Sequence, residues 1–234
     1  MPDDKGLRGR RALKVQVKSA KRRKASSVRW LERQLNDPYA AAARAEGYRA
    51  RSAYKLAEID DRFHLLAPGK SVVDLGAAPG GWSQVLAKRV GAGGRVIAID
   101  LLEMEPVAGV EFIRGDFAAR KGLAAIEAAL GAGGADLVLS DMAPNLSGIA
   151  ISDQARCMEL AEIARDFALS HLKRDGALLV KIFQGAGYDE YLLSLRRAFR
   201  KVVVRKPDAS RDESAEQYLL ACGLRAETKS APGG

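Results

Sequence analysis

From residue 67 onward, short apolar runs alternate with longer amphipathic segments. The apolar runs span residues 71–75, 95–100, 110–113, 135–140, 177–183, 201–204 and 218–222. Several have no polar face, which is typical of strands covered on both sides of a parallel sheet. The segments between them, at 82–90, 118–130, 154–172 and 188–199, have helical patterns. The alternation predicts an α/β protein with a doubly wound, mostly parallel seven-stranded sheet.

A mostly helical segment at 27–66 precedes this alternation and ends at the turn sequence Ala67-Pro68-Gly69-Lys70. It mixes basic residues, among them Arg29, Arg49 and Arg51, with Trp30 and three tyrosines. Packing of these aromatic side chains against a core is favoured over stacking on bases. We expect a basic tail at 1–26, one domain at 27–224 divided into the helical segment 27–66 and a core at 67–224, and a flexible tail at 225–234.

The composition is that of a soluble protein with a substantial core: 234 residues, of which 47% are hydrophobic. The sequence has no apolar run long enough to cross a membrane and no signal-peptide core at its charged N-terminus. Cys157 and Cys222 are too far apart for a CxxC pair, so neither a metal site nor a disulfide framework is indicated. We expect a cytoplasmic protein without metal. Nothing indicates an oligomer, so we expect a monomer.

The net charge of +9 is concentrated in the first residues. Residues 1–27 carry ten Lys or Arg against Asp3 and Asp4, which leaves the rest of the chain close to neutral. A segment this basic and this poor in apolar residues would bind phosphates without sequence preference. A merely solubilising tail is the alternative.

The residues after the first predicted strand read DLGAAPGGW at 74–82, a glycine-rich bend leading into a helix. A dinucleotide fold would carry GxGxxG, but here Ala78 takes the second glycine position and Pro79 removes an amide donor. A pyrophosphate is therefore disfavoured, and a nicotinamide-dependent dehydrogenase is remote. S-adenosylmethionine has no phosphate and fits such a loop better.

Aspartates follow three other predicted strands at the edge where such folds bind ligands. We expect Asp100 to accept from ribose hydroxyls and Asp116, near the expected adenine, to accept from its amino group; Asp141 follows the fourth strand. Any one of them could equally be a strand-end or helix-capping residue. The three together with the loop are more specific.

Lys181 interrupts the apolar strand at 177–183. Burying an ammonium is costly unless a partner or a function compensates, although a lysine at a strand end can extend its amine into water. A ribose hydroxyl is a poor nucleophile, so methylating it requires in-line placement and a group that takes the proton. A buried lysine can be that group.

Five motifs together resemble the FtsJ (RrmJ) family of 2′-O-ribose methyltransferases: RSAYKL at 51–56, DLGAAPGGW at 74–82, SDMAPN at 140–145, VKIFQG at 180–185 and SAEQY at 214–218. The resemblance covers about 27–224 and implies a Rossmann-like class I methyltransferase fold. The family's Lys-Asp-Lys-Glu tetrad falls on Lys55, Asp141, Lys181 and Glu216.

The resemblance assigns roles to these positions. Lys181 would be the base, Asp141 and Glu216 would orient the lysine and the hydroxyl, and Lys55 would supply positive charge. S-adenosylmethionine would be held by Gly80, Trp82, Asp100, Asp116 and Asp141. The implied substrate is a uridine ribose in 23S rRNA within the large ribosomal subunit, with Arg29, Arg49 and Arg51 contacting RNA.

Two other functions stay open. Base methylation is one, but cytosine C5 chemistry needs a cysteine nucleophile, and neither Cys157 nor Cys222 follows a predicted strand suitably. The other is a non-catalytic RNA-binding or ribosome-assembly module that keeps the fold. His64 and His171 are expected to be packing or surface residues.

Overall fold

The computed structural model describes residues 36–144, 147–211 and 214–226. The predicted basic tail, the candidate RNA ligand Arg29 and most of the predicted C-terminal tail lie outside these ranges.

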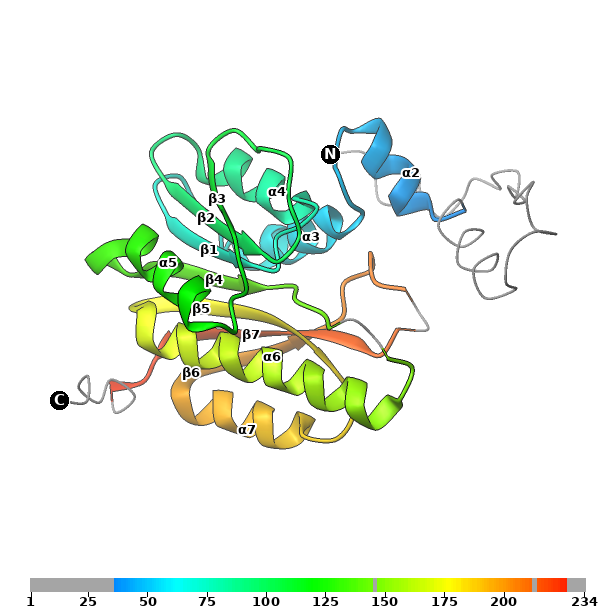
Figure 1. The fold of residues 1–234 in the computed structure, drawn as a ribbon, viewed down its shortest axis with the longest axis vertical. Coiled ribbons are helices and arrows are strands. Elements are labelled where there is room, and N and C mark those ends of the chain that lie inside the picture. The colour runs from blue at the N-terminus through cyan, green and yellow to red at the C-terminus, as the bar shows by residue number, and fades with distance from the viewer. Residues whose placement is uncertain (1–35, 145–146, 212–213, 227–234) are drawn as a thin grey trace.

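The described chain forms a seven-stranded sheet and its covering helices (Figure 1). The strands are β1 (Ser71–Leu75), β2 (Arg95–Asp100), β3 (Val110–Arg114), β4 (Ala135–Ser140), β5 (Leu172–Phe183), β6 (Phe199–Arg205) and β7 (Glu216–Leu224). The helices are α2 (Pro38–Ala45), α3 (Ser52–Phe63), α4 (Gly81–Val90), α5 (Arg120–Leu130), the short 3-10 helix η3 (Gly131–Gly133), α6 (Ala150–His171) and α7 (Tyr188–Ala198).

The strand order is β3-β2-β1-β4-β5-β7-β6. β1 to β5 pair in parallel, whereas β7 is antiparallel to both β5 and β6. The order reverses between β1 and β4, the kind of crevice where open α/β sheets bind ligands. The predicted doubly wound, mostly parallel seven-stranded sheet is confirmed.

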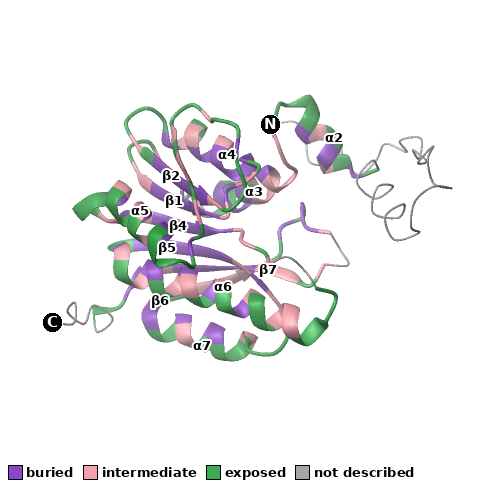
Figure 2. Ribbon diagram, viewed as in Figure 1, coloured by how far each residue is buried: buried purple, intermediate pink, exposed green. Residues whose placement is uncertain are grey.

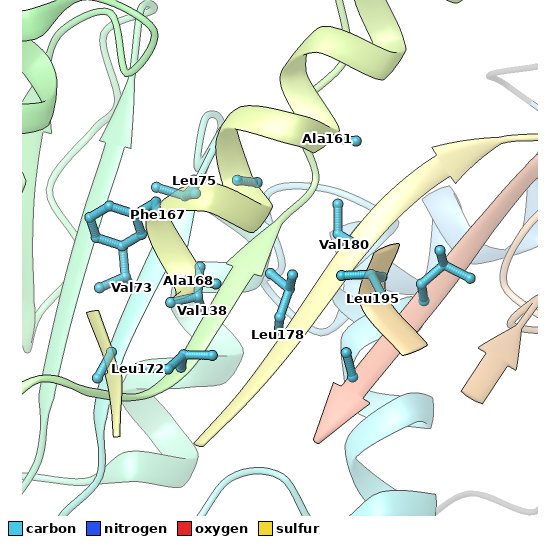
Figure 3. Close-up of a cluster of buried hydrophobic side chains, with 14 of the residues drawn as sticks. Val73, Leu75, Val138, Ala161, Phe167, Ala168, Leu172, Leu178, Val180 and Leu195 are labelled. Atoms are coloured by element: carbon cyan, nitrogen blue, oxygen red, sulfur yellow. The ribbon is translucent and has the colours of Figure 1, made fainter. Parts of the chain in front are cut away.

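Helices cover both faces of the sheet. On one face, Leu56 of α3 and Leu86 of α4 pack with Leu139 and Leu179 of the sheet. On the other, α6 covers β4 and β5 while α7 covers β6 and β7, and Phe167 and Leu195 of these helices join a cluster with Val73 and Val138 (Figure 3). The central strands are buried and the helices expose their outer sides (Figure 2), which accounts for strands without a polar face.

Within the predicted helical segment, the described residues 36–66 contain two helices, α2 and α3, separated by a turn at Gly47 with a φ of +78°. The structure corrects two predicted boundaries. α6 begins at Ala150, before the predicted 154. The prediction missed the first turn because Ile151 is exposed there and the turn has no helical apolar pattern. β5 begins at Leu172, before the predicted 177, because Leu172 pairs with Ala135 of β4; the register then shifts across the exposed residues that precede Ala177.

The described residues also test the expectations for membrane-spanning helices, metal ligands, cysteines and histidines. None of their helices is long and apolar enough to cross a membrane, and no group of three metal-ligating side chains occurs among them. Both cysteines are free thiols. His64 ends α3 with a left-handed φ of 51°, and His171 ends α6 with its ring against Phe167. Both histidines therefore have structural surroundings, as predicted.

Candidate active site

The loop after β1 requires glycine at two positions. Gly76 has a φ of +80°, and a Cβ there would lie 2.7 Å from Cγ of Met142. Gly80 has a φ of +104°, and a Cβ there would lie 2.9 Å from both Nη1 of Arg49 and Sδ of Met104. α4 then starts at Gly81, so the backbone amides of its first turn face the carboxyl edge of the sheet.

Asp100, at the end of β2, accepts two backbone hydrogen bonds. Its Oδ2 accepts from the amide of Ala78 at 2.9 Å and its Oδ1 from the amide of Leu102 at 2.8 Å. Asp116 follows β3, and its Oδ1 accepts from the amide of Ala118 at 2.9 Å. Each carboxylate therefore has a local structural role and keeps free acceptor capacity, since each oxygen carries two lone pairs. Their cofactor contacts stay a prediction.

Trp82 is turned into the protein. The residue is 2% exposed, its Nε1 donates to the carbonyl oxygen of Ser52 at 2.8 Å, and its ring lies 5.8 Å from that of Tyr218 between centroids. The indole therefore packs α4 against α3 and the sheet. The side chain of Trp82 is therefore used for packing, and the predicted cofactor contact of this residue stays a prediction.

Asp74 of β1 lies beneath the same loop and is fully buried. Its Oδ2 accepts from the hydroxyl of Ser83 at 2.7 Å, and its Oδ1 has no hydrogen-bond partner among the described residues. Burial raises the pKa of Asp74 to about 7; the Ser83 hydrogen bond opposes this, and the charges of Asp141 and Asp100 add to it. A buried carboxyl with an unpaired oxygen can accept from, or neutralise, a cationic ligand group at the loop.

Lys181 and Asp141 form the centre of the site. The Lys181 amine lies 2.9 Å from Oδ1 of Asp141 and also donates to the Asp141 carbonyl oxygen at 2.5 Å. The Lys181 side chain is only 9% exposed. The alternative of a solvated strand-end lysine is therefore wrong: the amine is held in place by a carboxylate that follows the neighbouring strand.

Lys55 of α3 and Glu216 of β7 form the second ion pair, with 2.5 Å between Nζ and Oε1. Their side chains are 11% and 12% exposed, so water screens this pair less than a surface salt bridge. The four tetrad residues thus form two ion pairs contributed by a helix, two strands and the residue following β4.

Tyr218 joins the two pairs, a role that the sequence interpretation missed. Its hydroxyl donates to Oδ1 of Asp141 at 2.8 Å, and the Lys55 amine lies 5.7 Å from its ring centroid. Burial, with the charges of Asp141 and Glu216, raises the pKa of Tyr218 well above its usual value. The hydroxyl therefore stays protonated and keeps donating. Tyr218 lies two residues after Glu216 in a predicted strand, and this spacing could have indicated that the two side chains share a face.

Strand register explains why these side chains meet on one face. Lys181 pairs directly with Tyr218 across β5 and β7, and Glu216 lies two residues before Tyr218, on the same side of the strand. Leu179 and Leu220, also at alternate positions, belong to the cluster that includes α3 and α4. The tetrad therefore lies on the face covered by α3, from which Lys55 projects.

Known proteins resemble this chain over most of its length. A model of the FtsJ-like methyltransferases matches residues 48–224. The chain belongs to the FtsJ-like methyltransferase family. Relatives named ribosomal RNA large subunit methyltransferase E include one from Xanthomonas campestris pv. campestris, 56% identical over 88% of this chain and 99% of its own, and one from Azoarcus, 56% identical over 87% of this chain and 100% of its own.

A crystal structure of a ribosomal RNA methyltransferase from Plasmodium falciparum superposes with a TM-score of 0.67. It is 28% identical and covers 76% of this chain and 98% of its own. The resemblance drawn from the five motifs is therefore confirmed at the level of the family. The roles of individual residues in this FtsJ-like methyltransferase stay predictions.

Of the predicted RNA ligands, Arg49 and Arg51 are described, and both have partners within this methyltransferase. Arg51 forms an ion pair with Asp37 and donates to the carbonyl oxygen of Ala209. Arg49 donates to backbone carbonyls of two loops near the β1 and β2 ends. Their predicted contacts with RNA stay a prediction, and any such contact would add to these internal ones.

Proposed function

We propose that this methyltransferase transfers a methyl group from S-adenosylmethionine to the 2′-oxygen of a ribose in ribosomal RNA of the large subunit, at a uridine. The observation that carries the proposal is the buried Lys181 amine held by Asp141 at the carboxyl edge of the sheet. This is the edge that also carries the glycine loop and Asp100. Relatives named for large-subunit ribosomal RNA support the substrate class.

The donor set fits S-adenosylmethionine. Glycines with positive φ at Gly76 and Gly80 shape the loop, with Met142, Arg49 and Met104 packed where a Cβ would lie, and the unpaired Oδ1 of Asp74 suits a cationic ligand better than a phosphate. Asp100 and Asp116 retain acceptor capacity for hydroxyl and amino groups. When bound, the cofactor would supply an electrophilic methyl group on a sulfonium. The backbone at Gly80 and Trp82, with Asp100, Asp116 and Asp141, would hold it.

Lys181 would act as the general base. Its amine would take the proton of the 2′-hydroxyl while that oxygen gains the methyl group and the electrons of the broken carbon–sulfur bond stay on the sulfur of the cofactor. Asp141 restricts the amine through both its carboxylate and its carbonyl oxygen. The Lys181 side chain is therefore held in one conformation before the ribose binds. Positioned proton transfer of this kind typically contributes about 10²- to 10⁴-fold in rate.

The Lys55–Glu216 pair would position the ribose on the other side of Tyr218. Glu216 can accept from a hydroxyl, while Lys55 places positive charge near the negatively charged backbone of a bound nucleotide. Tyr218 fixes the distance between the two pairs, because its hydroxyl binds Asp141 while its ring lies against Lys55.

Base methylation by a cysteine nucleophile has little support. Burial raises the pKa of the Cys157 thiol and, likewise, that of Cys222. A nucleophilic cysteine requires the opposite shift, because the thiolate is the reactive form. The charge of Lys181 acts to lower the pKa of the Cys157 thiol, but burial prevails.

The test is methyl transfer to large ribosomal subunits that lack the modification, with labelled S-adenosylmethionine, followed by digestion and identification of the labelled nucleoside. We expect a 2′-O-methylated uridine. Lys181→Met should lower kcat by about 10²- to 10⁴-fold with cofactor binding retained. Lys173→Met is the matched control, because Lys173 lies on the same strand at its exposed opposite end.

Label in a base would replace the proposal by base methylation. Absence of transfer by a folded wild-type protein that still binds the subunit would favour the non-catalytic assembly factor. Transfer by Lys181→Met within tenfold of wild type would remove Lys181 as the base.

A further inference from the structure

Arg49 lies between α2 and α3, and its guanidinium bridges two loops at the cofactor end of the sheet. Nη1 donates to the carbonyl oxygens of Pro79 at 3.4 Å and Glu105 at 2.5 Å, and Nη2 donates to that of Pro106 at 2.8 Å. Pro79 belongs to the loop after β1, and the other two belong to the loop after β2. One side chain from the N-terminal segment thus ties together two loops separated from it in sequence.

The backbone around Arg49 is fixed to α4 as well. The side-chain amide of Gln84 accepts from the Arg49 amide at 2.9 Å and donates to the Gly47 carbonyl oxygen at 2.9 Å. This two-point contact holds residues 47–49 along the first turn of α4, the turn that starts at the cofactor loop. The position of the N-terminal segment and the position of the loop are therefore not independent.

Contacts at Gly80 show how closely Arg49 approaches the loop. A Cβ at Gly80 would meet Nη1 and Cδ of Arg49 at 2.9 and 3.3 Å, and the buried sulfur of Met104 at 2.9 Å. Gly80 is thus covered by Arg49 from the N-terminal segment and by Met104 from the loop after β2. The glycine that would approach the cofactor is backed by the side chain that bridges the loops.

Asp100 ties the same two loops through the opposite backbone groups. It accepts from the amides of Ala78 and Leu102, whereas Arg49 donates to carbonyl oxygens of the same loops. No carboxylate pairs with Arg49 among the described residues, so its charge acts on peptide dipoles. Hydrogen bonds from a charged donor are about twice as strong as neutral ones, which suits Arg49 to restrain the loops.

We propose that Arg49 is a positioning residue that links the segment at 46–51, which carries the predicted RNA ligands Arg49 and Arg51, to the two cofactor loops, so that cofactor binding and RNA binding strengthen each other. The proposal rests on the function proposed above. In this proposal Arg49 holds the two loops of the methyl-donor site in place, a role different from that of a residue that only binds an RNA phosphate. By thermodynamic reciprocity, whatever orders the segment on RNA must tighten cofactor binding by the same factor that the cofactor tightens RNA binding.

The experiment measures binding of S-adenosylhomocysteine by equilibrium dialysis, first without RNA and then with large ribosomal subunits. Arg49→Ala and Arg49→Lys should each weaken binding at least about tenfold without RNA, within the usual range of coupling between sites. Lysine keeps the charge but cannot bridge carbonyls of two loops with a planar fork. Arg44→Ala is the matched control, an exposed arginine at the last turn of α2, and it should leave the dissociation constant unchanged.

With subunits present, wild type should bind S-adenosylhomocysteine more tightly than alone, and Arg49→Ala should lose that gain. Thermal melting of each variant confirms folding. The proposed positioning role of Arg49 is overturned if both Arg49 variants bind S-adenosylhomocysteine with the affinity of wild type. It is also overturned if Arg49→Lys restores Arg49→Ala fully, which would indicate a charge effect. Because the dialysis requires no methyl transfer, either result leaves the proposed 2′-O-methylation to its own test.

Discussion

The buried carboxyl of Asp74 should make the stability of the protein depend on pH in a predictable direction. Its pKa rises from 3.8 to about 7 in the folded state, chiefly through burial. Between about pH 4 and 7 the unfolded chain releases this proton while the folded protein keeps it, so folding stability falls as pH rises through that window. A pKa difference of about 3, at 1.36 kcal/mol for each pH unit, corresponds to about 4 kcal/mol.

Asp74→Asn removes the titration, because an amide is neutral and still offers an acceptor to the Ser83 hydroxyl. The free energy of unfolding of the variant relative to wild type, from urea melts at a series of pH values, should therefore increase by about 4 kcal/mol between pH 4 and 8. A difference that stays constant across this range within about 0.5 kcal/mol would refute the reasoning, because that is the scatter between independent sites.

Asp136→Asn provides a control of opposite sign. Partial burial acts to raise the pKa of Asp136, but hydrogen bonds from Lys173 and from the Ser71 amide prevail and lower it. The stability that this carboxylate contributes is present above its unfolded pKa and is lost as pH falls through the folded one. The free energy of unfolding that Asp136→Asn loses relative to wild type should therefore be largest near neutral pH and become smaller in acid.

Three further predictions concern the tetrad and the tail. Tyr218→Phe should lower kcat about 10-fold or more, since a hydrogen bond to a charged group contributes about 1.5–3 kcal/mol; an unchanged kcat would remove the hydroxyl from the site. A double-mutant cycle of Lys55→Ala and Glu216→Gln on unfolding free energy should give a coupling of at least about 1 kcal/mol, within the range for contacting residues, and additivity would contradict a strong pair. Deleting residues 1–26 should weaken binding to large subunits and flatten its salt dependence, whereas unchanged binding would reject a docking role.

The sequence alone determined the fold class, because seven apolar runs, several of them without a polar face, and the intervening amphipathic segments allow few other arrangements. The boundaries of individual strands and helices were harder to predict from the sequence. The exposed residues Lys173–Asp175 near the start of β5 carry no apolar signal, and the strand reaches back to Leu172 through the pairing of that buried residue with Ala135 of β4. Likewise, the first turn of α6 exposes Ile151, so its helical state could not be read from hydrophobic periodicity.

The sequence also indicated the types of residue in the site, because Lys181 stands out in an apolar strand and aspartates follow successive strands. It could not say which side chains touch. The contact of Tyr218 with Asp141, the pairing of Lys55 with Glu216 and the bridging of two loops by Arg49 each join residues at least 30 positions apart. Such contacts depend on strand register and helix placement, which only the packed structure decides, because local pattern determines which face a side chain takes but not its neighbour across the fold.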